Sequence, residues 1–185
     1  MDLSSTGIYG SLWRNNIWRM ASLQEDIKTS SDWIVKAFGS DKLKLDYSVE
    51  SLKLLDDFFD KHSASGKAKP NGRLSQNLGA TLFSIGSYLG ETIIRNVPGS
   101  SWRTNDEDPQ GEVDAEVVLP DGTTLRPMQR VIKRFKEGAE DGIYAYGAVV
   151  IREMGPGDYW EKIKQTVEAR NAGKVRAKKP WWKFW

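Results

Sequence analysis

Residues 74–96 read LSQNLGATLFSIGSYLGETIIRN, and their apolar side chains recur at the spacing of one helix face. That face comprises Leu78, Leu82, Ile85, Leu89 and Ile93. Three glycines, Gly79, Gly86 and Gly90, interrupt the run, and each costs about 1 kcal/mol relative to alanine inside a helix. Because a helix that carries them needs the close approach of a neighbour, we expect a tightly packed helix over roughly Leu74–Asn96, ended by Pro98-Gly99.

The sequence before this helix predicts two more helices and one short strand. The first helix has Met20, Leu23, Ile27, Ile34 and Phe38 on one face and stops at Gly39. Leu43, Leu45 and Tyr47 alternate as in a short strand. The second helix would be capped by Asp46 or Ser48, and its buried face would hold Leu52, Leu55 and Phe58 or Phe59. Residues 62–73 are a loop by composition.

The sequence after residue 100 has a more extended character. Trp102 begins this region, Val113, Ala115 and Val117 alternate with charged residues, and residues 120–123 form a turn that leads into Thr124-Leu125. A helix then starts at Pro127 and stops at Gly138. We expect a strand or a buried segment over Ile143–Ile151, and a last helix that opens at residues 158–161.

These elements predict an α+β fold, with N-terminal helices packed on a small antiparallel sheet and followed by a C-terminal helix. We expect one domain over residues 1–169, loose over 1–15, and a separate tail over 170–185. The chain has no cysteine, so disulfides, thiolate metal sites and cysteine nucleophiles are excluded. It shows no signal peptide, and its longest uncharged run falls short of the ~20 apolar residues of a membrane span, so we expect a cytoplasmic protein.

The formal charge of +2 conceals an asymmetry between the domain and the tail. Residues 170–185 hold six of the 27 basic residues and none of the 25 acids, which leaves the domain with a formal charge of −4. The candidate binding residues of the tail are Lys178, Lys179, Trp181, Trp182, Lys183, Phe184 and Trp185.

Three kinds of partner are consistent with this basic and aromatic tail. Its aromatic side chains can dock on the domain, on a partner protein or on a second subunit, since large exposed aromatic clusters are costly. Tryptophan and lysine also favour an anionic membrane surface, so the protein could be membrane-peripheral. Stacking on nucleic acid is the third reading, and the negative charge of the domain disfavours it.

The sequence contains no catalytic constellation, and we expect no cofactor and no metal. Residues 106–114 resemble a calcium loop in their first nine positions, but Val117 stands where a bidentate glutamate is required. The only histidine, His62, excludes a multi-histidine metal site, and we interpret it as a helix cap or a surface residue. Glu91 could be a carboxylate in a cleft, although a structural acceptor is the simpler reading.

Several short pieces of the chain carry a family resemblance over residues 45–146. They are residues 45–52, residues 86–91, Trp102, Asp121-Gly122 and Pro127 before a basic helix. In this order they resemble small bacterial α+β domains of unknown function. The resemblance implies a compact α+β domain and no particular activity, and some domains of this style serve as immunity proteins.

These observations lead to three hypotheses about function. The first is a non-enzymatic binding protein, of an immunity type, whose acidic body meets a basic partner. The second is a peripheral membrane protein anchored by its tail. The third is a hydrolase that uses a cleft carboxylate such as Glu91.

Overall fold

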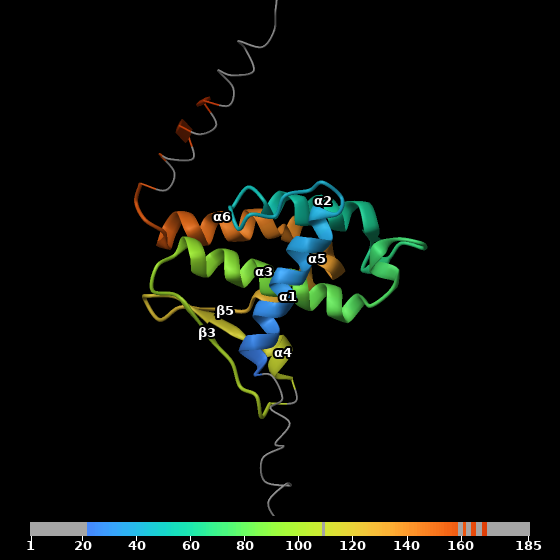
Figure 1. Ribbon diagram of the computed structural model, residues 1–185, viewed down its shortest axis with the longest axis horizontal. Helices are drawn as coiled ribbons and strands as arrows, with labels where there is room; N and C mark the ends of the chain where they lie inside the picture. The colour runs from blue at the N-terminus through green and yellow to red at the C-terminus, as the bar shows by residue number, and fades with distance from the viewer. Residues whose placement is uncertain (1–21, 109, 159–160, 162–163, 166–167, 170–185) are drawn as a thin grey trace, which may run out of the picture.

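The computed structural model describes residues 22–108, 110–158, 161, 164–165 and 168–169, and it has the α+β architecture that the sequence predicts (Figure 1). Its helices are α1 (Leu23–Gly39), α2 (Leu52–His62), α3 (Leu78–Asn96), α4 (Gly111–Asp114), α5 (Pro127–Glu137) and α6 (Ile143–Met154), with short 3₁₀ turns at Arg73–Ser75 and Ala139–Asp141. Its strands are β1 (Ser63–Ala64), β2 (Lys67–Ala68), β3 (Ser101–Arg103), β4 (Glu116–Val118) and β5 (Thr124–Leu125).

Helix α3 lies at the centre of the molecule, and α1, α5 and α6 all pack against it (Figure 1). It begins at Leu78 rather than at Leu74, because Asn77 has a left-handed backbone with φ of 53°. Ile85, Tyr88, Leu89 and Ile93 are fully buried along it. The long helix predicted from the sequence is therefore confirmed, apart from its first turn.

Two of the three glycines of α3 let neighbouring elements approach the helix closely, as expected for glycines inside a helix. A side chain at Gly86 would place its Cβ 2.9 Å from the Cα of Met128 in α5. A Cβ at Gly90 would overlap the indole ring of Trp102 from β3. Gly79, in contrast, has open space around it. The two glycines that are four residues apart thus let α5 and the sheet approach the central helix.

Strands β3, β4 and β5 form one antiparallel sheet, with Trp102 opposite Val117 and Val117 opposite Leu125. The turn between β4 and β5 is closed by hydrogen bonds from Leu119 N to Thr123 O (2.8 Å) and from Gly122 N to Leu119 O (2.9 Å). The predicted hairpin is therefore confirmed.

The extended region before this hairpin is shorter than predicted. Val113 lies in the short helix α4 and Ala115 follows it, so the strand begins only at Glu116. The side chain of Asp114 accepts a hydrogen bond from Gln129 Nε2 at 2.8 Å, which ties the end of α4 to α5.

The strand predicted over Leu43–Tyr47 is absent from the described residues. Tyr47 has a left-handed backbone with φ of 60°, and its N–H donates to the hydroxyl of Tyr88 at 2.8 Å. Within the described residues this segment pairs with no strand, and of its side chains only that of Leu45 is buried. Within the predicted loop over residues 62–73, by contrast, β1 and β2 form a small hairpin around Ser65-Gly66, both of which have positive φ.

The segment Ile143–Ile151 is helical, which corrects the prediction of a strand, and it forms the first part of α6. Both carboxylate oxygens of Asp56 in α2 accept backbone N–H groups at its start, from Ile143 and from Tyr144, each at 2.9 Å. Gly147 lets the side chain of Leu52 approach the helix backbone. These contacts with α2 are long-range, and they outweigh the strand preference of the β-branched residues.

The first two helices agree with their predicted faces, apart from Met20, which lies outside the described residues. Ser22 and Glu25 form a capping box at the start of α1, and Ile27, Ile34 and Phe38 are buried along it. In α2 the whole predicted face is buried, including both Phe58 and Phe59. Neither Asp46 nor Ser48 is the N-cap of α2, because Ser51 occupies that position; the Ser48 hydroxyl instead accepts from Ser51 N at 3.3 Å in the preceding turn.

Candidate functional site

The tail residues that the sequence singles out lie outside the described residues. These are Lys178, Lys179, Trp181, Trp182, Lys183, Phe184 and Trp185. Their binding role stays a prediction, and so does the helix expected from residue 158, of which only scattered positions are described.

In the loop over residues 106–114, carboxylates that a calcium loop would use as metal ligands accept hydrogen bonds from backbone and side-chain donors instead. Asp106 Oδ1 accepts from Leu23 N at 2.8 Å, and Asp108 Oδ1 accepts from Gln110 N at 2.9 Å. Gly111 is required because a Cβ there would lie 2.5 Å from the carbonyl oxygen of Asn105. The described residues contain no group of three or more potential ligands placed to hold a metal ion. The loop thus joins α1 to α4.

Glu91 is a structural acceptor on α3. Its Oε1 accepts from Trp102 Nε1 at 3.0 Å, and its Oε2 pairs with Arg95 one turn later at 3.5 Å. This bond holds the indole that packs on Gly90. Glu91 lines none of the three cavities described below.

Two adjoining cavities lie in the described part of the chain beside α1 and α2. The first has a volume of ≈ 470 Å³ and lies between the end of α1, the segment after it and α2. The second has a volume of ≈ 280 Å³ and lies between α1 and the start of α3. Phe38, Phe58 and Arg73 line both. We call the combined site the aromatic groove, and it is lined by Trp33, Phe38, Leu43, Leu54, Phe58 and Arg73.

The floor of the aromatic groove is made of phenylalanine and its mouths carry exposed apolar side chains. Phe38 and Phe58 pack with their ring centroids 5.2 Å apart. Trp33 is 53% exposed at one mouth, and Leu43 is 39% exposed at the other. Exposed apolar side chains gathered around an apolar hollow are typical of a binding surface.

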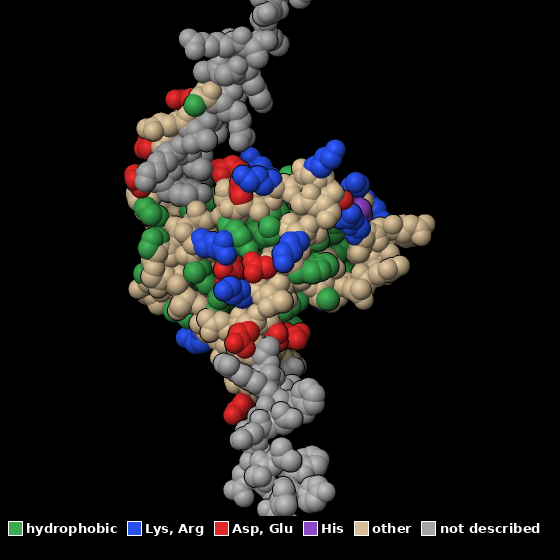
Figure 2. Space-filling model, in the orientation of Figure 1, with side chains coloured by type: hydrophobic (Ala, Val, Ile, Leu, Met, Phe, Trp, Pro, Cys, Tyr) green, Lys and Arg blue, Asp and Glu red, His purple; other side chains and the backbone are tan. Residues whose placement is uncertain are grey.

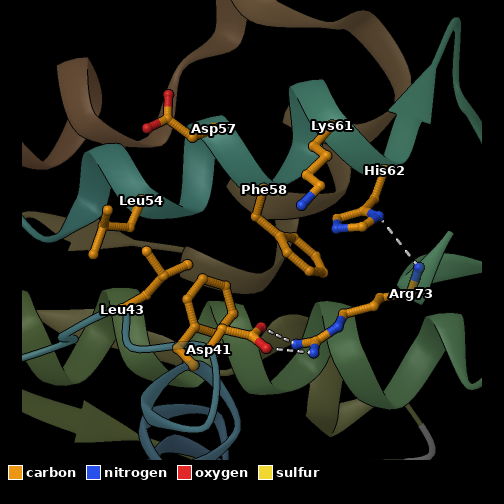
Figure 3. A pocket seen from close by; sticks show the side chains of 9 residues that line it. Asp41, Leu43, Leu54, Asp57, Phe58, Lys61, His62 and Arg73 are labelled. Carbon is orange, nitrogen blue, oxygen red and sulfur yellow. Dashed lines mark hydrogen bonds and ion pairs between the residues drawn. The ribbon is translucent and has the colours of Figure 1, made fainter.

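An ion pair lies across the aromatic groove where its two cavities meet. The guanidinium of Arg73 donates to Asp41 Oδ1 at 2.7 Å and also pairs with Asp41 Oδ2 (Figure 3). Asp41 follows α1 and Arg73 precedes α3, so this pair ties together the segments that frame the groove. The two charges largely cancel each other.

His62 closes one end of the aromatic groove as the last residue of α2. Its Nδ1 accepts a hydrogen bond from Arg73 N at 3.3 Å, and its ring lies against Phe58 with centroids 4.8 Å apart. Burial lowers the pKa of His62 below its ordinary value, and the nearby cations Lys61, Arg73 and Lys69 lower it further. The residue does end a helix, as expected, but its imidazole accepts a hydrogen bond instead of acting as a cation on the helix end.

Basic side chains gather around this histidine on the molecular surface. Figure 2 shows several of them beside the purple histidine, at the end of the molecule that carries the β1–β2 hairpin in Figure 1. Lys61 and Arg73 line the cavity itself. This end of the groove is thus electropositive although the domain as a whole has an acidic composition.

A third cavity of ≈ 170 Å³ lies between α3, α4 and α5. It is lined mainly by apolar side chains, among them Phe83, Val113 and Met128, with Glu112 at its edge. It is smaller than the size typical of a ligand site, about 300–1,000 Å³. We therefore take the aromatic groove as the candidate site.

The sequence analysis missed the aromatic groove. Its lining comes from α1, the loop after it, α2 and the turn before α3, and no local pattern joins these segments. One signal was present: Trp33 lies beside the buried face of the first helix instead of on it. A tryptophan at such a position is a candidate contact residue.

Comparisons with family models, curated proteins and solved structures found no match to this chain. The resemblance over residues 45–146 to small bacterial domains of unknown function therefore stays a prediction. Among the helices that the structure describes, none combines the length and the apolar character needed to cross a lipid bilayer.

Proposed function

We propose that this chain is a non-enzymatic binding protein whose aromatic groove holds an apolar segment of a partner protein. The observation that carries the proposal is the groove itself, with Phe38 and Phe58 as its floor and Trp33 and Leu43 exposed at its mouths. Exposed aromatic anchors beside a hollow are the arrangement that dominates binding energy at protein interfaces.

The dimensions of the groove support a peptide segment as its occupant. Its larger cavity, at ≈ 470 Å³, accommodates one or two large side chains, and the second cavity continues it past Arg73. A segment with apolar residues at two positions would fill both cavities. This is the general form of recognition in which a groove receives the anchor residues of a peptide.

The bonding of the two candidate acid–base groups also supports a binding role. Nδ1 of His62 is occupied by a backbone donor, and Glu91 is bound to Trp102 and to Arg95. A general base needs a free acceptor within reach of a substrate proton. The hydrolase hypothesis for Glu91 therefore has no geometric support in the described residues.

The immunity-type role and the basic partner expected from the sequence remain separate proposals. The rim of the aromatic groove carries Asp41, Asp57, Lys61 and Arg73, so it has no acidic excess that would attract a basic segment. A basic partner would have to contact another surface of the chain.

Peptide selection tests the proposed function directly. A phage-displayed random peptide library would be selected against the wild type and against a double variant, Trp33→Ser with Leu43→Ser. A matched control would carry Val113→Ser with Val149→Ser, since these side chains are similarly exposed, at 40% and 48%, and lie away from the aromatic groove.

We expect peptides with aromatic or long aliphatic anchors from the wild type and from the control. The groove variant should bind those peptides about tenfold more weakly, as is typical for the loss of anchor contacts. Enrichment of the same peptides with equal affinity by the groove variant would show that binding occurs elsewhere.

A further inference from the structure

The charges around the aromatic groove are unequal at its two ends. The charge of Arg73 is neutralised by Asp41, whose two carboxylate oxygens pair with the two terminal nitrogens of the guanidinium. Lys61 also lines the larger cavity, and within the described residues its ammonium has no ion-pair or hydrogen-bond partner. Figure 3 shows this ammonium pointing into the cavity beside the imidazole of His62. One uncompensated positive charge therefore faces the space that a ligand would occupy.

The imidazole of His62 adds a hydrogen-bond donor at the same place. A backbone N–H always donates, so the bond from Arg73 N requires Nδ1 of His62 to be the unprotonated nitrogen. In the neutral ring the proton is then on Nε2, which lies on the side of Lys61 in Figure 3. The backbone of Arg73 is thus a positioning group that fixes which nitrogen of His62 can donate to a ligand.

The electrostatic field at this end is also positive. The pKa of His62 is lowered by burial and then by Lys61, Arg73 and Lys69, and Asp41 offsets these cations only in part, so the local field opposes a positive charge on the ring. The same field favours an anion. Phe58 and Phe38 lie beside these donors, so the anion would belong to a molecule with an apolar body.

Asp57 lines the same cavity but lies one helical turn before Lys61 on α2. No hydrogen bond or ion pair joins it to another described residue, and Figure 3 shows its carboxylate pointing away from Lys61. Its negative charge would repel an anion at that end. An acidic group should therefore bind only at the end formed by Lys61 and His62.

We propose that Lys61 and Nε2 of His62 bind a carboxylate in the aromatic groove, and that the partner segment carries an acidic side chain next to an apolar or aromatic one. This inference rests on the proposed function of the groove and adds the charge of its occupant. It assigns the carboxylate to a side chain within the segment, and a probe with a free C-terminal carboxyl group tests a chain terminus as the alternative.

Blocked dipeptides test this chemistry. Acetylated and amidated tryptophan–glutamate, tryptophan–glutamine and tryptophan–lysine carry a negative, a neutral and a positive second side chain, and the first two have nearly the same shape. A fourth probe, acetylated tryptophan–glutamine with a free C-terminal carboxyl group, tests a chain terminus as the source of the anion. Binding would be followed through the NMR signals of the His62 ring, which are unambiguous because the chain has only one histidine.

We expect the glutamate peptide to bind about fivefold more tightly than the glutamine peptide, and the lysine peptide to bind most weakly, as for one charge-assisted contact at a partly exposed site. Lys61→Met should abolish this preference and leave the glutamine peptide unaffected. The control Lys28→Met removes an exposed lysine outside the groove and should keep the preference. Asp57→Asn should tighten binding of the glutamate peptide.

The outcomes separate this inference from the proposed function. Equal binding of the glutamate and glutamine peptides would overturn the carboxylate site but leave the apolar groove standing. Tighter binding of the free-carboxyl probe than of the glutamate peptide would overturn its assignment to a side chain. If none of the four probes perturbs His62, both the inference and the proposed function fail.

Discussion

Gly90 is the residue at which the central helix and the sheet meet, because its missing side chain makes room for the indole of Trp102. We predict that Gly90→Ala lowers the free energy of unfolding by about 1–3 kcal/mol, the usual cost of overpacking a rigid contact. Gly79→Ala in the same helix is the matched control. Its new methyl group meets open space, so it should be neutral or stabilise the protein by up to about 1 kcal/mol.

Urea unfolding of the two variants provides the measurement. Equal effects of the two substitutions would mean that Trp102 does not pack on Gly90 as described. Trp102→Phe adds a second check, since it replaces the indole by a smaller ring and removes the hydrogen bond to Glu91. Combined with Gly90→Ala, it should relieve part of the overpacking.

The lowered pKa of His62 makes the free energy of unfolding depend on pH. Its pKa in the folded protein lies below the ordinary value of 6.5, because of burial and then the neighbouring cations. The unfolded chain therefore takes up a proton at higher pH than the folded one, and stability is lost as the pH falls from about 6.5 through the folded pKa. We expect a lower free energy of unfolding at about pH 5.5 than at about pH 7.5.

The contribution of His62 to this effect can be isolated, since it is the only histidine. His62→Gln keeps an acceptor near Arg73 N but cannot titrate, so it should reduce the pH dependence in this window. Lys61→Met should raise the pKa of His62 toward its ordinary value, as read from the ring signals by NMR. An unchanged pKa in Lys61→Met would contradict the positive field that we assign to this end of the groove.

At the scale of elements, Asp56 joins three helices. From α2 it accepts both N–H groups at the start of α6, and its Oδ1 pairs with Arg134 Nε of α5 at 3.0 Å. Arg134 is only 3% exposed and also pairs with Asp60 at 2.5 Å. Burial lowers the pKa of Arg134, but the hydrogen bonds that Arg134 donates to Asp60 and Asp56 outweigh burial, so its pKa is raised and its charge is kept.

We predict that Asp56→Ala destabilises the protein by about 3 kcal/mol, because it leaves a buried guanidinium with one partner fewer and the start of α6 uncapped. Asp57→Ala, at the exposed neighbouring position, should change the free energy of unfolding by less than about 0.5 kcal/mol. Chemical denaturation of both variants checks this. Similar losses for both would contradict the junction between α2, α5 and α6.

The same junction shows which elements the sequence could predict. The faces of α1, α2, α3 and α5 follow from helical spacing, and the β4–β5 hairpin follows from its turn residues. For residues 143–151 the strand alternative is wrong, because Val149, Val150 and Ile151 favour strands locally, whereas the alternative of a buried segment holds for one face of α6. The contacts that make it helical, from Asp56 and Leu52, come from about 90 residues earlier in the chain and leave no local signal.

At the scale of the whole molecule, the aromatic groove could not be predicted for a similar reason. Phe38 and Phe58 were correctly predicted as buried, yet their exposed neighbours Trp33 and Leu43 become a site only when α1 packs over α3 beside α2. The prediction concentrated instead on the tail, where charge and aromatic residues are visible without a fold. The buried residues were thus predictable from the sequence, whereas the aromatic groove that lies over them was not.

The hypothesis of a membrane-binding tail makes a prediction for the full chain. Its six basic residues should each contribute about 1 kcal/mol at an anionic surface, so the full chain should co-sediment with phosphatidylserine vesicles far more than with neutral ones. A chain that ends at Gly173 should lose this binding. Equal sedimentation of the two chains would refute the hypothesis and favour docking of the tail on the domain or on a partner.

The central claim is that the aromatic groove of the folded domain binds an apolar segment, and the most direct measurement uses the neutral tryptophan–glutamine peptide with the His62 ring as reporter. The account predicts saturable shifts of the ring signals in the wild type and in the Val113→Ser, Val149→Ser control, and their loss in Trp33→Ser, Leu43→Ser. Unchanged His62 signals in the wild type, or equal shifts in the groove variant, would contradict it.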